Sequence, residues 1–304
     1  MSTPSKVGLS DGANYPSLTA WEYDVDGDGG TQIAELTTDI TDNLQLYTWP
    51  ASDITIRSDK PGVKRTVTSS SSGSGGNHMI HAGDADINSL TIEDIILDGT
   101  GQNPSGSGKS GIMTTLGTGT LTLNRVHIKN VTQYSVLIWS NSTTNTLDCD
   151  NCIFESGDDG AYRGALSTTE ATFRNCLFVK CGDGASHSHG AIYCADDANN
   201  KNYFYNCLSF GNNGADFSHA GTASGNGALT YVRHCVSEDG TADDAHDDNT
   251  GSVANKAATG TYFTDYDNGD YTLRHEDFTN WTINGEAANT PAKDFNNRTR
   301  VNND

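Results

Sequence analysis

The sequence predicts an all-β fold, a right-handed single-stranded parallel β-helix with a short N-terminal helical cap and a C-terminal cap. Three observations predict it: a phrase that returns six times, a second short strand before most copies, and no helical period between them. Such strands bury their apolar faces only by stacking on the next copy. We expect an N-terminal cap at 1–45, the β-helix at 46–240 and a C-terminal cap at 241–304.

The recurring phrase sets the register of the coils. Its copies span 90–97, 121–128, 147–154, 171–178, 203–210 and 230–237. They align on Asp94, Arg125, Asn151, Asn175, Asn206 and His234, at intervals of 31, 26, 24, 31 and 28 residues. The apolar alternation of a strand slips by one residue at the aligned position, so the chain must bend there. Asparagine, present in three copies, tolerates the left-handed backbone of such a bend.

A second strand is expected before each later copy. The segments are GIMTT at 111–115, SVLIW at 135–139, GALST at 164–168, GAIYC at 190–194 and ADFSH at 215–219. Stacked coils would then hold ladders of like side chains, including a run of cysteines and the pair Phe154 and Phe178.

The N-terminal cap begins with a short helix within residues 15–35, where Thr19 and Glu22 have the spacing of a capping box. A solenoid needs such a plug, because its first coil would otherwise expose unpaired backbone and core. Residues 35–59 read as the first strands, and the Ser/Gly tract between Pro61 and Asn77 reads as an exposed loop.

The C-terminal part begins with an acidic, polar segment from Asp239 to Gly260, which reads as a long turn. The segment after it carries Trp281 and other aromatic residues among polar ones. This pattern indicates a closing cap that contains strands.

Seven cysteines raise the question of disulfides. Most fall at inward ladder positions, where buried thiols behave as small apolar residues, so we expect reduced structural cysteines. The alternative is a disulfide or metal site among Cys149, Cys152, Cys176, Cys181 and Cys194.

The formal net charge is −21, from 39 acidic and 18 basic residues. A surface of this sign repels nucleic acid and anionic membranes, so neither is expected as a partner. No run of 18 apolar residues indicates a membrane span, and the first residues lack the charged start and apolar core of a signal peptide. We expect synthesis and folding in the cytoplasm of a host cell.

The phrases FRNCLF and YNCLSF resemble those of right-handed β-helix proteins of the pectate-lyase-like type. The opening YPSLTAWE with IAEL, and the close NGDYTLRHEDFTNWTIN with PAKDFNNRTRVNND, resemble the two ends of β-helix proteins encoded by tailed bacteriophages. In such relatives the closing segment often continues through an Asp-Ile-Gly stretch, whereas this sequence stops at Asp304. The resemblance implies a virion location, other virion proteins as partners, and self-association, commonly as a trimer.

Residues 24–35 match the twelve-residue calcium loop. The ligand set would be Asp24, Asp26, Asp28 and Glu35, with glycine at position 6. Thr31 occupies the position that is usually apolar, and a strand instead of a second helix is expected to follow. Two interpretations stay open, a Ca²⁺ site and a solvated acidic turn.

An enzymatic interpretation requires a base beside carboxylates or charge-neutralising groups. The best candidates are Arg163, His189, Lys180 and Asp159, in a wider set with Asp158, Tyr162, Asp183, His187, Asp216 and His219. These residues lie mostly in glycine-rich turns, where solvated loop residues are the default. His78 and His81 are expected to flank a turn.

Three functions follow, in order of preference. The first is a non-enzymatic structural protein of a phage virion, as a capsid decoration or a component of a tail fibre or spike, with no required cofactor. The second is a carbohydrate-active enzyme, a polysaccharide lyase or glycoside hydrolase. The third is an adhesive module that binds a host-surface glycan through exposed aromatics such as Tyr193, Tyr203 and Tyr205.

Overall fold

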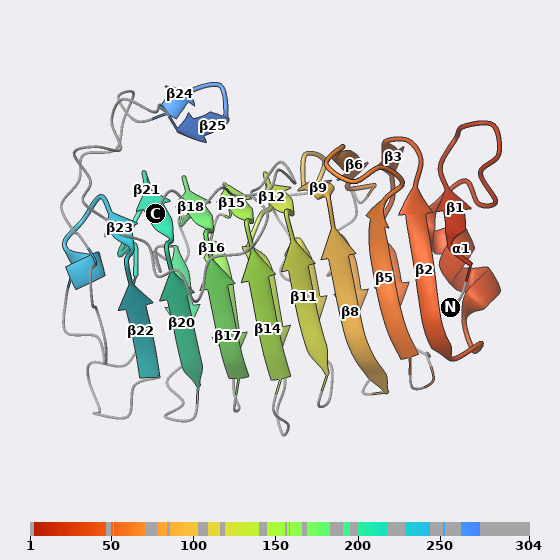
Figure 1. The fold of residues 1–304 in the computed structure, drawn as a ribbon, viewed down its shortest axis with the longest axis horizontal. Coiled ribbons are helices and arrows are strands. Elements are labelled where there is room, and N and C mark those ends of the chain that lie inside the picture. Colours follow the sequence, from red (N-terminus) through yellow and green to blue (C-terminus); the bar gives the residue numbers. More distant parts are fainter. Residues whose placement is uncertain are drawn as a thin grey trace, which may run out of the picture.

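Three parallel sheets wrap around one elongated core (Figure 1). The computed structural model describes residues 3–46, 50, 52–70, 78–83, 86–102, 109–115, 119–139, 145–155, 157, 159–165, 169–182, 191–194, 200–217, 229–243, 252 and 263–273. Within these ranges every strand pair of the three sheets is parallel, as the repeat predicts.

The three sheets are named A, B and C. Sheet A contains β1 (Ser5–Val7), β2 (Gly30–Leu36), β5 (Ser52–Ser58), β8 (Ile87–Glu93), β11 (Thr120–Asn124), β14 (Asn145–Asp150), β17 (Thr169–Arg174), β20 (Lys201–Tyr205) and β22 (Leu229–Arg233). Sheet B contains β3 (Ile40–Thr41), β6 (Arg65–Thr68), β9 (Ile95–Asp98), β12 (His127–Lys129), β15 (Ile153–Glu155), β18 (Leu177–Val179), β21 (Leu208–Phe210) and β23 (Val236–Ser237). Sheet C contains β4 (Leu44–Leu46), β7 (Ile80–Ala82), β10 (Ile112–Thr114), β13 (Tyr134–Trp139), β16 (Gly160–Ala165) and β19 (Ile192–Cys194).

The order of strands shows a solenoid. Six successive coils, from β2–β3–β4 to β17–β18–β19, each give one strand to every sheet. Two further coils give β20 and β21, then β22 and β23. The predicted parallel β-helix is therefore confirmed. Its right-handed sense stays a prediction, which rests on the strong preference of parallel crossovers for that hand.

The bend between sheets A and B is the one that the repeat predicts. All six aligned residues have a left-handed backbone, with φ between 50° and 55°. A second left-handed bend, which the sequence analysis missed, ends strands of sheet B at Asn130, Lys180 and Gly211. Each coil is thus folded by single residues at fixed positions, and the strands between them stay short.

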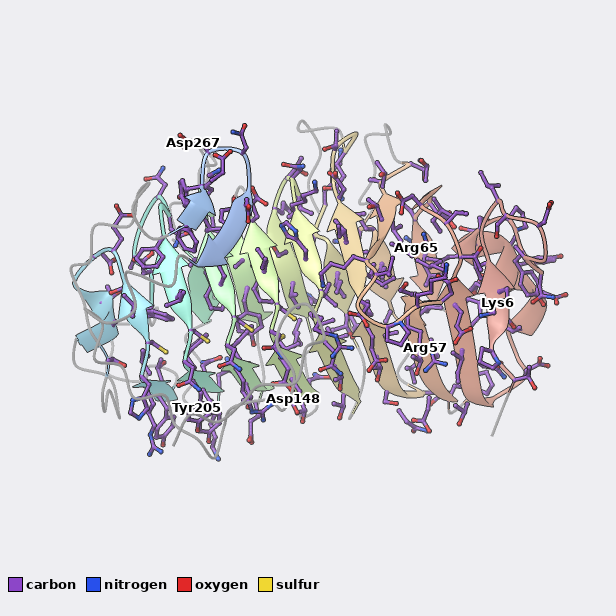
Figure 2. All side chains as sticks on the ribbon, turned by 45° about the horizontal axis from the view of Figure 1, so that its top comes forward. Lys6, Arg57, Arg65, Asp148, Tyr205 and Asp267 are labelled. Carbon is purple, nitrogen blue, oxygen red and sulfur yellow. The ribbon has the colours of Figure 1, made fainter. Side chains whose placement is uncertain are left out.

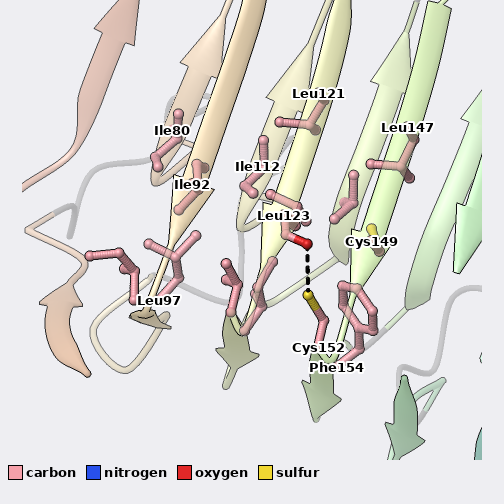
Figure 3. Close-up of a cluster of buried hydrophobic side chains, with 14 of the residues drawn as sticks. Ile80, Ile92, Leu97, Ile112, Leu121, Leu123, Leu147, Cys149, Cys152 and Phe154 are labelled. Atoms are coloured by element: carbon pink, nitrogen blue, oxygen red, sulfur yellow. Dashed lines mark hydrogen bonds between the residues drawn. The ribbon is translucent and has the colours of Figure 1, made fainter. Parts of the chain in front are cut away.

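The core consists of side-chain ladders that run from coil to coil (Figure 3). Phe154 stacks on Phe178 at 5.2 Å, which confirms the predicted aromatic pair. Six cysteines are buried and free, which confirms the prediction of reduced structural thiols for Cys149, Cys152, Cys176, Cys181, Cys207 and Cys235. The side chain of Cys194 lies outside the described residues.

The cysteines that follow the bend stack in a column. The Cys152 thiol donates to the carbonyl of Leu123 in the preceding coil at 3.4 Å (Figure 3). The thiols of Cys176, Cys207 and Cys235 make the equivalent bonds at 3.4 to 3.5 Å. Burial raises the pKa of Cys176 and Cys235 well above that of a free thiol. The thiols of Cys176 and Cys235 are therefore neutral donors that fill the corners of their coils.

A helix lies at the N-terminal end of the solenoid (Figure 1). Helix α1 (Leu18–Val25) buries Leu18, Trp21 and Val25 in the same core as the strands. The predicted capping box is wrong. The N-cap is Ser17, whose hydroxyl accepts from the Ala20 N–H at 3.0 Å, and the Thr19 hydroxyl instead donates to Asp42 at 2.7 Å. The first coil, β2–β3–β4, begins within the segment assigned to the cap.

The C-terminal part has a short 3-10 helix, η1 (Thr241–Asp243), and an antiparallel hairpin, β24 (Phe263–Asp265) and β25 (Asp270–Leu273). The hairpin packs on the outside of sheet B, near β18 and β21 (Figure 1). The strand predicted at 215–219 is wrong for its described residues, because Asp216 and Phe217 form a turn. Trp281 lies outside the described residues.

Candidate functional site

The outer face of sheet A carries two columns of side chains in register. One column holds the residues immediately before each bend and their register partners in β2 and β5: Glu35, Arg57, Glu93, Asn124, Asp150, Arg174, Tyr205 and Arg233. The second column lies two residues earlier in each strand: Ile33, Thr55, Thr91, Thr122, Asp148, Thr172, Tyr203 and Tyr231. Alternation along each strand places these side chains outside and their neighbours in the core.

Charges of opposite sign alternate in places along the first column. At its N-terminal end Glu35 pairs with Lys6 and, at 2.6 Å, with Arg57. Burial opposes ionisation, yet the hydrogen bonds from Lys6 and Arg57 hold the pKa of Glu35 below its ordinary value. Figure 2 shows Lys6 and Arg57 at this end of the molecule.

A second group of charges lies farther along the same face. Arg174 contacts Asp148 at 2.7 Å and Asp150 at 3.0 Å through one guanidinium nitrogen. Burial raises the pKa of Asp150, and Arg174 partly offsets this effect. The side chains stay 25 to 39% exposed, so water or a ligand can reach them.

Three tyrosines form a patch beside this group. Tyr203 stacks on Tyr231 with ring centroids 4.8 Å apart and planes 14° apart. Tyr203 is also nearly parallel to Tyr205, at 6.3 Å and 8°. All three side chains are half-buried. Tyr205 and Asp148 lie along the lower edge of Figure 2, towards the C-terminal coils.

The structure does not bring the described enzymatic candidates together. Arg163 lies on β16 of sheet C, where its guanidinium sits over the rings of Tyr134 and Trp139 at 5.5 and 5.3 Å. Lys180 follows β18 of sheet B, and its ammonium sits 4.7 Å from the ring of Tyr266. Arg163 and Lys180 therefore lie on different sheets, and each contacts its own aromatic side chains.

The remaining members of that set are buried or lie outside the described residues. Asp159 is 7% exposed, and Tyr162 points into the core against Phe173 at 5.3 Å. His189 lies outside the described residues, as do Asp158, Asp183, His187 and His219.

Asp216 has a structural environment. Its carboxylate accepts hydrogen bonds from Ser209 and Asn212 at 3.0 and 2.6 Å, and from two backbone N–H groups at 2.8 and 3.2 Å. Burial nevertheless raises its pKa to about 7. The residue holds one corner of a coil together.

The residues of the predicted calcium loop are dispersed. Asp24 belongs to α1 and accepts from the Tyr15 hydroxyl at 2.5 Å, and Asp26 is the helix C-cap. Residues 30–35 belong to the extended strand β2, so Glu35 lies about 16 Å along the strand from Gly30. Among the described residues no group of three or more metal-binding side chains is clustered. Both interpretations, a Ca²⁺ site and a solvated acidic turn, stay predictions.

His78 lies just before β7 and His81 lies within it, with ring centroids 5.2 Å apart, so the prediction that the two residues flank a turn is wrong. The Nδ1 of His78 accepts from the backbone N–H of Ser110 at 3.1 Å. Burial and the nearby His81 lower the pKa of His78 to about 4, so this ring is neutral at neutral pH. We assign it a structural role at the coil corner.

Comparison of the chain with known families, characterised proteins and solved structures gave no match. No helix in the described ranges combines the length and apolar character needed to cross a membrane.

Part of the outer face of sheet A was not predicted from the sequence. Tyr203 and Tyr205 were predicted there as exposed aromatics, but Tyr231, Asp148 and Arg174 were not. The aligned phrase contains the signal that could have found them, because residues one and three positions before each bend must share one face. The alignment therefore already places Tyr231 beside Tyr203.

Proposed function

We propose that this chain is a non-enzymatic structural protein of a bacteriophage virion, a capsid decoration or a component of a tail fibre or spike. The virion assignment rests on the resemblance of the two chain ends to phage β-helix proteins. Its natural partners are other virion proteins and further copies of this chain, in a trimer if it follows those relatives.

The observation that carries the structural role is the continuous core. Inward side chains from the first coil to the coil of β22 and β23 form one buried cluster, so neighbouring coils support each other along the rod. A stack of this kind suits an extended, stiff component that spaces or decorates larger assemblies. The enzyme alternative has less support, because Arg163 and Lys180 lie on different sheets.

Two experiments test the proposal. Mass spectrometry of purified virions of the encoding phage should find this polypeptide in a fixed copy number. Incubation of the protein with neutral and acidic polysaccharides should release no unsaturated or reducing ends. Absence from the virion refutes the location. Release of such products, lost in Arg163→Ala or His189→Ala, refutes the non-enzymatic role.

A further inference from the structure

The orientation of the three tyrosines shows what their patch can bind. Tyr203 and Tyr231 lie on neighbouring strands, and coplanar rings cannot approach to 4.8 Å, so these two rings lie face to face. The planes of both rings therefore contain the strand direction. Tyr205 lies on the same strand as Tyr203 with a nearly parallel ring, so it stands beside Tyr203 and not on its face. The rings of Tyr203 and Tyr205 together form a short aromatic wall along strand β20.

One face of this wall adjoins Thr172 and Arg174 of the preceding coil. The register partner of Tyr203 on the side away from Tyr231 is Thr172, which is much shorter than a tyrosine. The register partner of Tyr205 is Arg174, which is drawn towards the preceding coil by Asp148 and Asp150. A step results, with the aromatic wall on one side and a floor of threonine and ion-paired side chains on the other.

The charges around the step cancel. Three carboxylates and three cations surround it on β14, β17, β20 and β22: Asp148, Asp150, Glu170, Arg174, Lys201 and Arg233. Their formal sum is zero, whereas the whole chain carries −21. The step is therefore a neutral area of an acidic molecule, and it offers both hydrogen-bond donors and acceptors.

We propose that this step on the outer face of sheet A, formed by Tyr203, Tyr205, Arg174 and the paired aspartates, is a binding site for a neutral glycan. The C–H face of a sugar ring carries slight positive charge and packs on the negative face of an aromatic ring. Its hydroxyl groups donate to Asp148 and Asp150 and accept from Arg174. An acidic polysaccharide fits less well, since the remainder of the surface repels it.

The test is a glycan array that carries neutral and acidic oligosaccharides, followed by calorimetric titration of the glycans that bind. The wild-type protein should bind one or more neutral glycans. Tyr203→Ala should weaken this binding by about tenfold or more, because the stacking face is lost. Tyr203→Phe keeps the ring and should bind within a few-fold of wild type. Tyr23→Ala, which removes an 84% exposed tyrosine from α1, is the matched control and should bind as wild type.

Thr172→Tyr tests the site without removing any contact. A tyrosine at this position continues the stack and covers the free face of Tyr203, so binding should be lost while the melting temperature is kept. Three results would overturn the proposal: no neutral glycan bound by the wild-type protein, binding confined to acidic glycans, or binding by Tyr203→Ala and Thr172→Tyr equal to wild type. The virion experiments are independent of this result, so each proposal can fail alone.

Discussion

At the scale of single residues, the left-handed bend decides whether a coil can close. Asparagine, aspartate, arginine and histidine all occupy it, so no single side chain is required. At Asp94 and Arg125, side-chain contacts between neighbouring coils support the bend. Arg125 binds Asp94 of the preceding coil through two hydrogen bonds of 2.8 and 3.0 Å, and the Lys64 ammonium donates to the Arg125 carbonyl. Burial lowers the pKa of Lys64 to about 8, which shows how enclosed this corner is.

The bend makes a first prediction at Asn175, whose φ is 50°. Asn175→Ala should lower the free energy of unfolding by about 1 kcal/mol, because alanine adopts the left-handed backbone less readily than asparagine, whose short polar side chain can hydrogen-bond locally. Asn175→Gly should stay closer to wild type, since glycine adopts this conformation without strain. Chemical denaturation of both variants measures the difference. Equal losses would show that the side-chain contacts of Asn175, and not its backbone, stabilise the bend.

Asp216 makes a prediction about pH. Its pKa is about 7 in the folded protein, against 3.8 for an ordinary aspartate. Between these values the native state holds a proton that the unfolded chain has released, so the contribution of Asp216 to stability falls as the pH rises from about 4 to about 7. Denaturation curves across this range should show this slope as a difference between wild type and Asp216→Asn. Asp267→Asn, at an exposed turn, should keep the wild-type slope.

At the scale of elements, the C-terminal hairpin is held on sheet B by a second, small core. Phe263 is buried and meets Phe210 of β21 at 5.8 Å. Around it the Tyr271 hydroxyl donates to Glu155 at 2.6 Å, and the Lys180 ammonium donates to the carbonyl of Tyr266 at 3.1 Å. A two-stranded hairpin is marginally stable alone, so its order depends on these contacts.

Phe263→Ala should therefore release the hairpin while the solenoid stays folded. Loss of a buried phenylalanine side chain costs about 3 to 5 kcal/mol of stability. We expect this loss to exceed the free energy that keeps the short hairpin docked on sheet B. Hydrogen exchange should show lost amide protection at 263–273 and unchanged protection in β14 and β17. Asp267→Ala changes an exposed residue of the same turn and should leave the exchange unchanged. Loss of protection along the whole chain would show that the hairpin is part of the main cooperative unit.

The acidic segment after α1 makes a prediction about metal. Since Glu35 is already bound to Lys6 and Arg57, we expect millimolar Ca²⁺ and a chelator to give the same melting temperature. The calcium interpretation predicts a rise with Ca²⁺ that vanishes in Asp26→Ala. Thermal melts of the wild type and of Asp26→Ala, each with Ca²⁺ and with a chelator, decide between a Ca²⁺ site and an acidic turn.

At the scale of the whole molecule, the repeat alone predicted the solenoid, the sheet A to sheet B bend and the strands of sheet C at 111–115, 135–139 and 190–194, which match β10, β13 and β19. The strand predicted at 164–168 overlaps β16 only at its last two residues. The period of the sequence carries this information because each coil must bury its inward apolar side chains against the same core. It failed where a segment departs from the repeat. The strand β6 (Arg65–Thr68), which precedes the Ser/Gly tract, was not predicted, and its position comes from pairing with β3 and β9. Most of the tract itself lies outside the described residues.

The candidate site was predictable only in part. The tyrosines on sheet A follow from the alternation of the phrase, but the position of Arg174 against Asp148 depends on how far its side chain reaches across coils. Likewise, the aromatic partners of Lys180, Tyr266 and Tyr271, come from the C-terminal hairpin, which has no fixed spacing to the repeat. The repeat gives the register of neighbouring strands within a sheet. It gives no information on contacts between a sheet and a segment outside the repeat.

The stacked architecture makes a final prediction, about how far a local change spreads. Trp21 is fully buried where α1 covers the first coil, so Trp21→Ala should cost about 3 to 5 kcal/mol. Because each coil contacts only its neighbours, the loss should fall mainly on β1 to β4 and fade along the rod. Hydrogen exchange should thus show reduced protection at this end and wild-type protection in β17 and β20. Tyr23→Ala, on the exposed side of the same helix, should change the free energy of unfolding by less than about 0.5 kcal/mol. A uniform loss along all strands of sheet A would mean that the rod unfolds as one unit, contrary to the nearest-neighbour view of its stability.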